Sequence, residues 1–314
     1  MSEIQDRSPS GFPSGTLRRS PSSPRTLFGL VMTGLTFLCA ALAILPLLAV
    51  LFYVVVQGAS RLNLTVLTSL PPPPCSGTGC VGLPQGGFGN AIMGTLAMVG
   101  IGALISIPFG VLAAVYLSEF SANSKLAYWI RFATNVLAGV PSIIVGVFAY
   151  GVAVLGMQKF LNLSVPFTAW AGGFALSILM LPIVVRATEE ALRLVPQEVR
   201  QAAVGLGASN FQTVSRVVLP AALPAIVTGT TLAVARAAGE TAPLLFTASF
   251  TQFWPNWNNG MLEPTASLAV LVYNFATGSF QNQQELAWAA SFILVLLVLF
   301  TSIVSRLATA RRVY

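Results

Sequence analysis

The sequence predicts an all-α integral membrane protein with six transmembrane helices. Of its 314 residues, 55% are hydrophobic and 8% are charged, and its mean hydropathy is +0.79, whereas a soluble domain is about 25% charged. Six apolar runs are long enough for the ~20 residues that a helix needs to cross a bilayer. The basic residues gather in alternate connections between these runs, which is the positive-inside pattern of membrane proteins.

The N-terminal segment and the first apolar run have different compositions. Residues 1–25 are rich in Ser, Pro and Arg and have no apolar pattern, so we expect a disordered cytoplasmic tail. The run Leu27–Val56 predicts a first transmembrane helix over residues 26–57. This run is longer than the ~7–15 residues of a signal-peptide core and ends at no small-residue cleavage site, which favours a retained helix.

Five further runs predict a membrane domain over residues 90–306. They are Ala91–Leu117, Phe132–Leu155, Ala169–Val185, Leu223–Phe246 and Leu286–Val304. Six spans place both termini in the cytoplasm, with a short tail over residues 307–314. The apolar stretch Ala266–Phe275 is too short to cross, which predicts a re-entrant or interfacial helix on the outer side.

The net charge of +7 follows this topology and does not indicate a nucleic-acid partner. Only Arg61 and Lys159 fall in predicted outer loops, and Arg236 falls inside a span. The basic residues predicted on the cytoplasmic side are Arg7, Arg18, Arg19, Arg25, Lys125, Arg131, Arg186, Arg193, Arg200, Arg216, Arg306, Arg311 and Arg312. We therefore expect a multi-pass protein in the lipid bilayer, and no nucleic acid.

Missing residue types and motifs argue against several functions. Histidine, the commonest metal ligand and general base, is absent, and the chain has three cysteines. No Gly-x-x-x-x-Gly-Lys-Ser/Thr phosphate loop occurs. We expect no catalytic residue, metal site or cofactor, and no ATPase activity in this chain. Adjacent Glu189 and Glu190 do not share a helix face and are interpreted as a solvated pair.

Prolines interrupt five of the predicted spans. A proline inside a helix removes a backbone hydrogen bond and kinks the helix. Five kinked helices favour a bundle around a cavity, although ordinary proline use in membrane helices explains any single one. These prolines are Pro46, Pro108, Pro141, Pro182 and Pro243.

The predicted outer loop over residues 58–89 contains two of the cysteines. Cys75 and Cys80 flank a Gly-containing turn on the oxidising side of the membrane. They are candidates for a disulfide, the alternative being two free thiols in a flexible loop. Cys39 lies in the first span and is interpreted as a lipid-facing or packing residue.

A polar, helix-prone segment over residues 186–220 separates two spans. Pro196 suits a first helical position, and Glu198 adds negative charge to the first turn. Gly207 predicts the end of this helix. One face is apolar at helical spacing, through Val199, Ala202, Ala203 and Leu206.

A second short helix follows in the same segment. Ser209 and Gln212 have the spacing of a capping box, and Pro220 and Pro224 predict the end of this helix before the next span. The segment is suited to docking on a partner, the alternative being a polar connector on the lipid headgroups.

Arg236 and Glu240 are the only ionisable residues deep inside a predicted span. A charge at the centre of a bilayer costs roughly 2.5–3.5 kcal/mol on insertion scales, so such residues usually face the bundle interior. Pro243 and Gly239 weaken the helix beside them. The pair predicts either a pathway for an oxyanion, which a guanidinium matches, or a structural salt bridge.

The docking segment resembles the cytoplasmic EAA loop of permeases in bacterial ATP-driven importers. The matching positions are Gln201, Ala202, Ala203, Gly207, Val217, Leu219 and Pro220. Three further segments resemble phosphate-importer permeases, the last of them those of the PstA type: 181–192, 139–146 and 239–244. The resemblance covers residues 88–305. One departure is Gln201, where the family usually has an acid, and nearby Glu198 is a candidate to compensate.

This resemblance implies a type I importer permease with a MetI-like core and a coupling helix. The implied partners are a PstC-type permease, a dimer of ATP-binding subunits and a periplasmic phosphate-binding protein, with inorganic phosphate as the cargo. The implied roles are coupling for Glu198, Gln201, Ala202, Ala203, Gly207, Leu219 and Pro220, and the substrate pathway for Arg236, Glu240, Thr241 and Ser142. For Ser142 and Thr241 the alternative is a hydrogen bond to nearby backbone.

Other functions stay open on the residues alone. A permease for sulfate or molybdate has the same general features. A membrane anchor needs no Arg236, and a lipid-processing enzyme needs clustered acid–base or metal-binding groups. The resemblance favours phosphate import into the cytoplasm across the bacterial inner membrane.

Overall fold

The computed structural model describes residues 24–75, 86–120, 124–161 and 167–310. Every regular element in these ranges is helical. The helices are α1 (Pro24–Ala59), α2 (Leu64–Thr68), α3 (Gly89–Val115), η2 (Tyr116–Phe120), α4 (Lys125–Gly139), α5 (Ser142–Ala149), η3 (Tyr150–Val154), α6 (Leu155–Leu161), α7 (Ala169–Arg193), α8 (Gln197–Gly205), α9 (Asn210–Thr213), η4 (Val214–Val218), α10 (Leu219–Ala238), α11 (Ala242–Thr247), α12 (Leu268–Thr277) and α13 (Gln281–Ala310). The η elements are single π-helical turns.

The chain divides into two compact units, Met1–Tyr53 and Val54–Tyr314. In the first unit, α1 runs unbroken through Pro46, and nearly all of its described side chains are exposed. Cys39 is among them, as a free thiol. The predicted N-terminal tail lies almost wholly outside the described residues.

Six helical segments of the described chain are long and apolar enough to cross a membrane, which confirms the predicted number. They are Thr26–Ala59, Gly89–Phe120, Ser142–Phe160, Ala169–Arg193, Asn210–Ala238 and Gln281–Val304. Most are longer than predicted because the helices continue past the apolar runs into polar sequence. The fourth, for example, extends eight residues beyond Val185 to Arg193.

The third predicted span, Phe132–Leu155, is wrong as a single helix. The structure has two helices there, because α4 ends at Gly139 and α5 begins at Ser142. Val140 is extended, with ψ 128°, and Pro141 is the N-cap of α5. A residue before proline is driven out of the α-helical region by the proline ring, so the break follows from Pro141.

The centre of the second unit is the pair α3 and α7, joined by α10 and α11. A Cβ on Gly173 would lie 2.5 Å from Ile101 Cγ2, and one on Gly102 would lie 3.1 Å from the Gly173 carbonyl oxygen. Glycine at these positions allows close backbone approach, as small residues do at membrane helix interfaces. Met98, Leu176 and other buried apolar side chains fill the core beside them.

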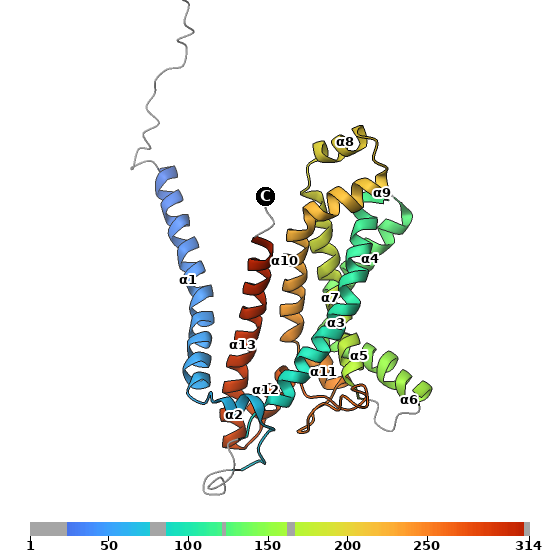
Figure 1. The fold of residues 1–314 in the computed structure, drawn as a ribbon. Helices are drawn as coiled ribbons and strands as arrows, with labels where there is room; N and C mark the ends of the chain where they lie inside the picture. Colours follow the sequence, from blue (N-terminus) through green and yellow to red (C-terminus); the bar gives the residue numbers. More distant parts are fainter. Residues whose placement is uncertain (1–23, 76–85, 121–123, 162–166, 311–314) are drawn as a thin grey trace, which may run out of the picture. The chain divides into compact units, whose positions relative to one another are not determined.

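The short apolar segment of the sequence forms α12, which is too short to cross, as predicted. It packs against α3 and α13, and Leu268, Leu271 and Phe275 are buried in that core. Its re-entrant or interfacial position on the outer side stays a prediction. Within the second unit, α12 lies at one end of the long helices, whereas α8 and α9 lie beyond the opposite end (Figure 1).

Candidate functional site

The structure breaks the fifth span beside the two charged residues. α10 ends at Ala238, Gly239 is its C-cap, and α11 begins at Ala242. Proline at position 243 has no N–H to donate to Gly239 O, which explains the break at this point. Arg236 Nε lies 3.5 Å from Glu240 Oε1, at the outer limit of a hydrogen bond. The predicted interruption is confirmed, and the charged pair spans it.

Arg236 lies near the middle of the long helices. Gly229 of α10 packs against Ala187 of α7, and the two helices run in opposite directions (Figure 1). Arg236 is seven residues beyond Gly229, or about 10 Å further along α10. That distance brings it to the level of Met180, close to the midpoint of the 25-residue α7.

The two members of the charged pair differ in burial. The Arg236 side chain is 62% exposed in the isolated chain, whereas the Glu240 side chain is 17% exposed. Arg236 lies on the uncovered face of α10, one turn after exposed Leu232 and two turns after exposed Thr228. Glu240 is partly covered where the helix breaks. The Arg236 guanidinium is thus paired with Glu240 on one side and accessible on the other.

Ser142 and Thr241 lie close to the same break. α5 packs against α11, and a Cβ on Gly146 would lie 2.8 Å from Pro243 Cα. Ser142 is one turn before Gly146, and Thr241 is two residues before Pro243. Within the described chain, neither hydroxyl makes a hydrogen bond. Their predicted alternative, bonding to nearby backbone, does not occur in this structure.

One charged residue that the sequence analysis assigned to a loop lies within a helix. Arg186, assigned there to the inner loop, lies within α7, is exposed, and donates to Asn135 Oδ1 of α4 at 2.8 Å. The apolar run ends at Val185, so hydropathy alone placed the end of the helix eight residues too early. The helical continuation to Arg193 is the signal that corrects it.

The projecting loop begins with α8. Pro196 is its N-cap, one position earlier than predicted, and Glu198 lies in its first turn. Gly207 has φ +86°, a left-handed conformation, and its N–H donates to Val204 O at 2.9 Å. Together with the bond from Ala208 N to Ala203 O, this is a Schellman motif, which confirms Gly207 as the stop.

The predicted capping box is also confirmed. The Ser209 side chain accepts from Gln212 N, and the Gln212 side chain accepts from Ser209 N. The predicted helix end at Pro220 and Pro224 is wrong, because the helix runs on from α9 through η4 into α10. The π turn leaves carbonyl groups without their usual partners directly before Pro220, where a missing N–H does least harm.

The apolar stripe of α8 is mostly exposed. Of the four predicted positions, Ala203 is 8% exposed and packs inward, whereas Leu206 is 91% exposed and Val199 and Ala202 are also exposed. Gln201 and Val204, which lie outside the stripe, are exposed as well. Phe211 of α9, which the sequence analysis did not single out, is 70% exposed. We call Val204, Leu206 and Phe211 the loop-tip surface. It lies between and at the ends of two of the segments long enough to cross a membrane, Ala169–Arg193 and Asn210–Ala238.

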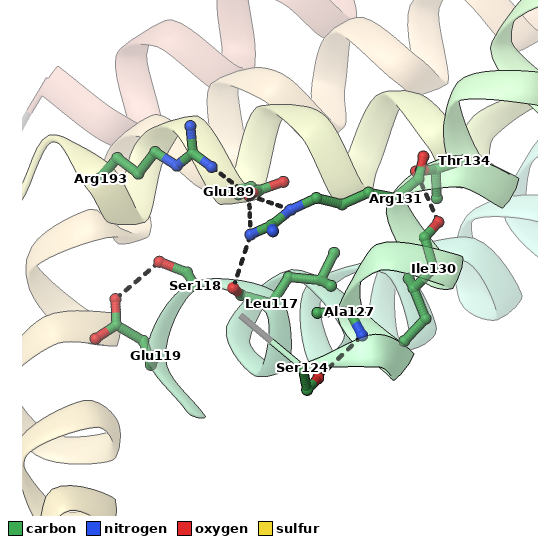
Figure 2. A network of polar contacts seen from close by, with 10 residues as sticks. All are labelled: Leu117, Ser118, Glu119, Ser124, Ala127, Ile130, Arg131, Thr134, Glu189 and Arg193. Carbon is green, nitrogen blue, oxygen red and sulfur yellow. Dashed lines mark hydrogen bonds and ion pairs between the residues drawn. The ribbon is translucent and has the colours of Figure 1, made fainter. Parts of the chain in front are cut away.

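The interpretation of Glu189 as part of a solvated pair is wrong. It is 12% exposed and accepts from Arg131 at 2.9 Å and from Arg193 at 2.6 Å. Arg131 also donates to Leu117 O at 3.0 Å, so it joins α4 to α7 and η2 (Figure 2). Only Glu190 is exposed, as expected. Tertiary packing therefore gives Glu189 and Glu190 different environments, although they are adjacent in the chain.

Cys75 is disulfide-bonded in the structure. Its backbone N–H donates to Asn282 Oδ1 at 3.2 Å, which attaches the outer loop to the start of α13. Cys80 lies outside the described residues, so the pairing of Cys75 with Cys80 stays a prediction.

Sequence comparisons identify relatives over most of the chain. A family described as binding-protein-dependent transport system inner membrane component matches residues 106–313. A Haemophilus influenzae protein named phosphate transport system permease protein PstA is 40% identical, covering 88% of this chain and 92% of that protein. A Bacillus subtilis protein named probable ABC transporter permease protein YqgI is 33% identical, covering 87% and 92%.

Solved structures of two transporters share the fold. A chain of a bacterial alginate ABC transporter aligns with a TM-score of 0.61 at 15% identity, covering 92% of this chain and 99% of that one. A chain of the inward-facing MetNI methionine ABC transporter aligns with a TM-score of 0.54 at 21% identity, covering 72% and 94%. The MetI-like helical core predicted from the sequence is thereby confirmed.

Proposed function

Since the chain belongs to the family of binding-protein-dependent transport system inner membrane components, and is a phosphate ABC importer permease of the PstA type, we propose how it moves phosphate. It works beside a second, PstC-type permease, with a pair of ATP-binding subunits on the cytoplasmic side and a phosphate-binding protein outside. Both termini lie in the cytoplasm of this multi-pass inner-membrane protein. The ATP-binding subunits, not this chain, hydrolyse ATP.

The exposure of Arg236 carries the proposal. Its guanidinium lies near mid-depth of the membrane domain and is 62% exposed in the isolated chain. Lipid cannot solvate a cation there without a cost of several kcal/mol. The exposed face of α10 is therefore covered by the second permease or by a water-filled path. A planar guanidinium on such a path matches the oxygens of phosphate.

The broken helix and the weak ion pair suit transient contact with an anion. Glu240 holds Arg236 at 3.5 Å, long enough for a phosphate oxygen to take over one side of the guanidinium. Ser142 and Thr241 supply two unengaged hydroxyls near the same break. The site therefore binds the anion weakly during its passage. Tight binding would trap the cargo.

The loop-tip surface is the proposed docking element. Exposed Leu206 lies in the connection between two membrane-crossing segments, so an apolar groove on a partner would cover it, and exposed Phe211 extends the same apolar surface. The low profile of Ala202 allows close approach of that partner. With Gln201 in place of the family's acid, apolar burial rather than an ion pair carries the contact, and exposed Glu198 adds the nearby negative charge. Leu219 and Pro220 connect the loop rigidly to α10.

Reconstituted transport tests this proposal. The complex purified through a tag on this chain is placed in liposomes with its binding protein and ATP, and uptake of radiolabelled phosphate is measured. The Arg236→Ala variant should assemble normally but lose most phosphate uptake. The Arg236→Lys variant should have an intermediate uptake rate, because lysine keeps the positive charge but cannot bind two phosphate oxygens with one planar group. Wild-type uptake by Arg236→Ala would refute the pathway role. Uptake of sulfate in preference to phosphate would refute the assigned cargo.

A further inference from the structure

The inner end of α3 is tied to the docking helix by one side chain. Arg200, in the middle of α8, donates from Nη2 to Glu119 Oε1 at 2.8 Å and from Nε to Glu119 Oε2 at 3.2 Å. Glu119 lies on η2, the π turn that ends α3. The pair is bidentate and inward-facing, since the Arg200 side chain is 17% exposed and that of Glu119 is 8% exposed.

Arg200 also binds the end of α7. It donates from Nη2 to Leu192 O at 2.8 Å and from Nη1 to Val195 O at 2.5 Å. The last carbonyl groups of a helix lack intrahelical partners, and an arginine at a helix C-terminus satisfies them. A single guanidinium thus joins three elements: α8, the end of α7, and η2.

The backbone of α8 has few other supports. It packs chiefly against η4 and α9, the neighbours that belong to the same loop. Beside Arg200 lies a cavity of about 480 Å³, whose lining includes Ser118, Glu119, Pro196 and Gln197. Among the described residues, this cavity takes the place of close packing on this side of α8, which leaves space for the helix to shift.

The second ionic network continues the connection. Arg131 of α4 donates to Leu117 O of η2, two residues before Glu119, and to Glu189 of α7 (Figure 2). A displacement that pulls η2 through Glu119 therefore acts on α3 directly and on α4 through Arg131. Both helices lead from this end of the bundle toward the opposite end.

We propose that the Arg200–Glu119 pair is the latch through which movement of the docking helix reaches α3 and α4. The inference rests on the proposed docking of α8 by an ATP-binding subunit. Arg200 and Glu119 are positioning residues, since they touch neither the cargo nor the partner. Their loss leaves α8 able to dock but disconnects it from the membrane helices, so ATP is hydrolysed without transport.

The test measures phosphate transported per ATP hydrolysed by the full reconstituted complex. Arg200→Ala and Glu119→Ala should each retain the ATP-binding subunit on purification and lower this ratio about tenfold, as expected for breaking a buried charge pair. The double variant should be no worse than Arg200→Ala, because Glu119 acts through Arg200. Glu119→Gln keeps the shape and should give a smaller loss, which separates coupling from misfolding.

Arg193→Ala is the matched control. Arg193 lines the same cavity, but its side chain is 64% exposed and its ion pair lies within α7, so the ratio should stay near that of the wild type. A wild-type ratio in Arg200→Ala, or additive losses in the double variant, would overturn the latch. Absence of phosphate-dependent ATPase activity in the unmodified complex would instead reject the proposed function.

Discussion

Replacement of Gly207 by alanine isolates the contribution of one backbone conformation to docking. Gly207 has φ +86°, and a Cβ built on it meets nothing within 4 Å. Alanine therefore introduces no clash within the chain, only the cost of the left-handed conformation, about 1–2 kcal/mol. A cost of that size reduces the population of the native loop by up to about 5–30-fold.

The loss should appear as weaker binding of the ATP-binding subunit. A partner that recognises only the native loop has an apparent affinity reduced by the fraction of loops in that conformation. We expect the dissociation constant to rise by up to about 30-fold when the purified subunit is titrated onto the permease complex in lipid nanodiscs. Phosphate-stimulated ATPase activity should need correspondingly more of the subunit to reach its maximum.

Gly205→Ala is the control for this experiment. Gly205 also has nothing within 4 Å of an added Cβ, but it lies in the last turn of α8 with a helical backbone. Alanine there favours the helix by about 1 kcal/mol, so binding should be unchanged or tighter. Equal affinities for Gly207→Ala and Gly205→Ala would show that the Schellman conformation does not position the docking surface.

Two further predictions follow from exposure and close packing. Leu206→Asp should weaken co-purification of the ATP-binding subunit by more than tenfold, because burial of a leucine contributes about 1.5–3 kcal/mol; undiminished recovery would place docking elsewhere. Gly146→Ala should lower the thermal midpoint of the detergent-solubilised protein by several degrees, because its Cβ would lie 2.8 Å from Pro243 Cα. A Cβ on Gly139 would meet nothing within 4 Å, so Gly139→Ala should leave the thermal midpoint unchanged. Equal midpoints for the two variants would contradict the close contact of α5 with α11.

The local signals in the projecting loop were reliable because they act over a few residues. Gly207 ends α8, and Ser209 with Gln212 caps α9, as the sequence indicated. Proline was less reliable: Pro141 separates two helices, whereas Pro46 and Pro220 lie in or beside continuous ones. A missing N–H is harmful only where its carbonyl partner has no other compensation, and that depends on the surrounding helix geometry.

Charge assignments show the limit of hydropathy. Arg186 and Glu189 follow the last apolar residue of a run, so they were assigned to a solvated loop. In the structure they belong to a helix that extends past the apolar run, and Glu189 is largely enclosed and paired with two arginines. Such a pair needs partners on other helices, here Arg131 of α4, which no local pattern can identify.

The sequence alone determined the class of protein, the number of membrane spans, the break beside Arg236 and the ends of α8. Each of these depends on composition or on contacts between residues close in the chain. The tertiary structure decided which faces remain uncovered: Arg236 and Leu206 are open, whereas Arg200 and Glu119 are enclosed against each other. Arg200 and Glu119 are 81 residues apart, and only the packing of distant helices brings them into one hydrogen-bonded pair.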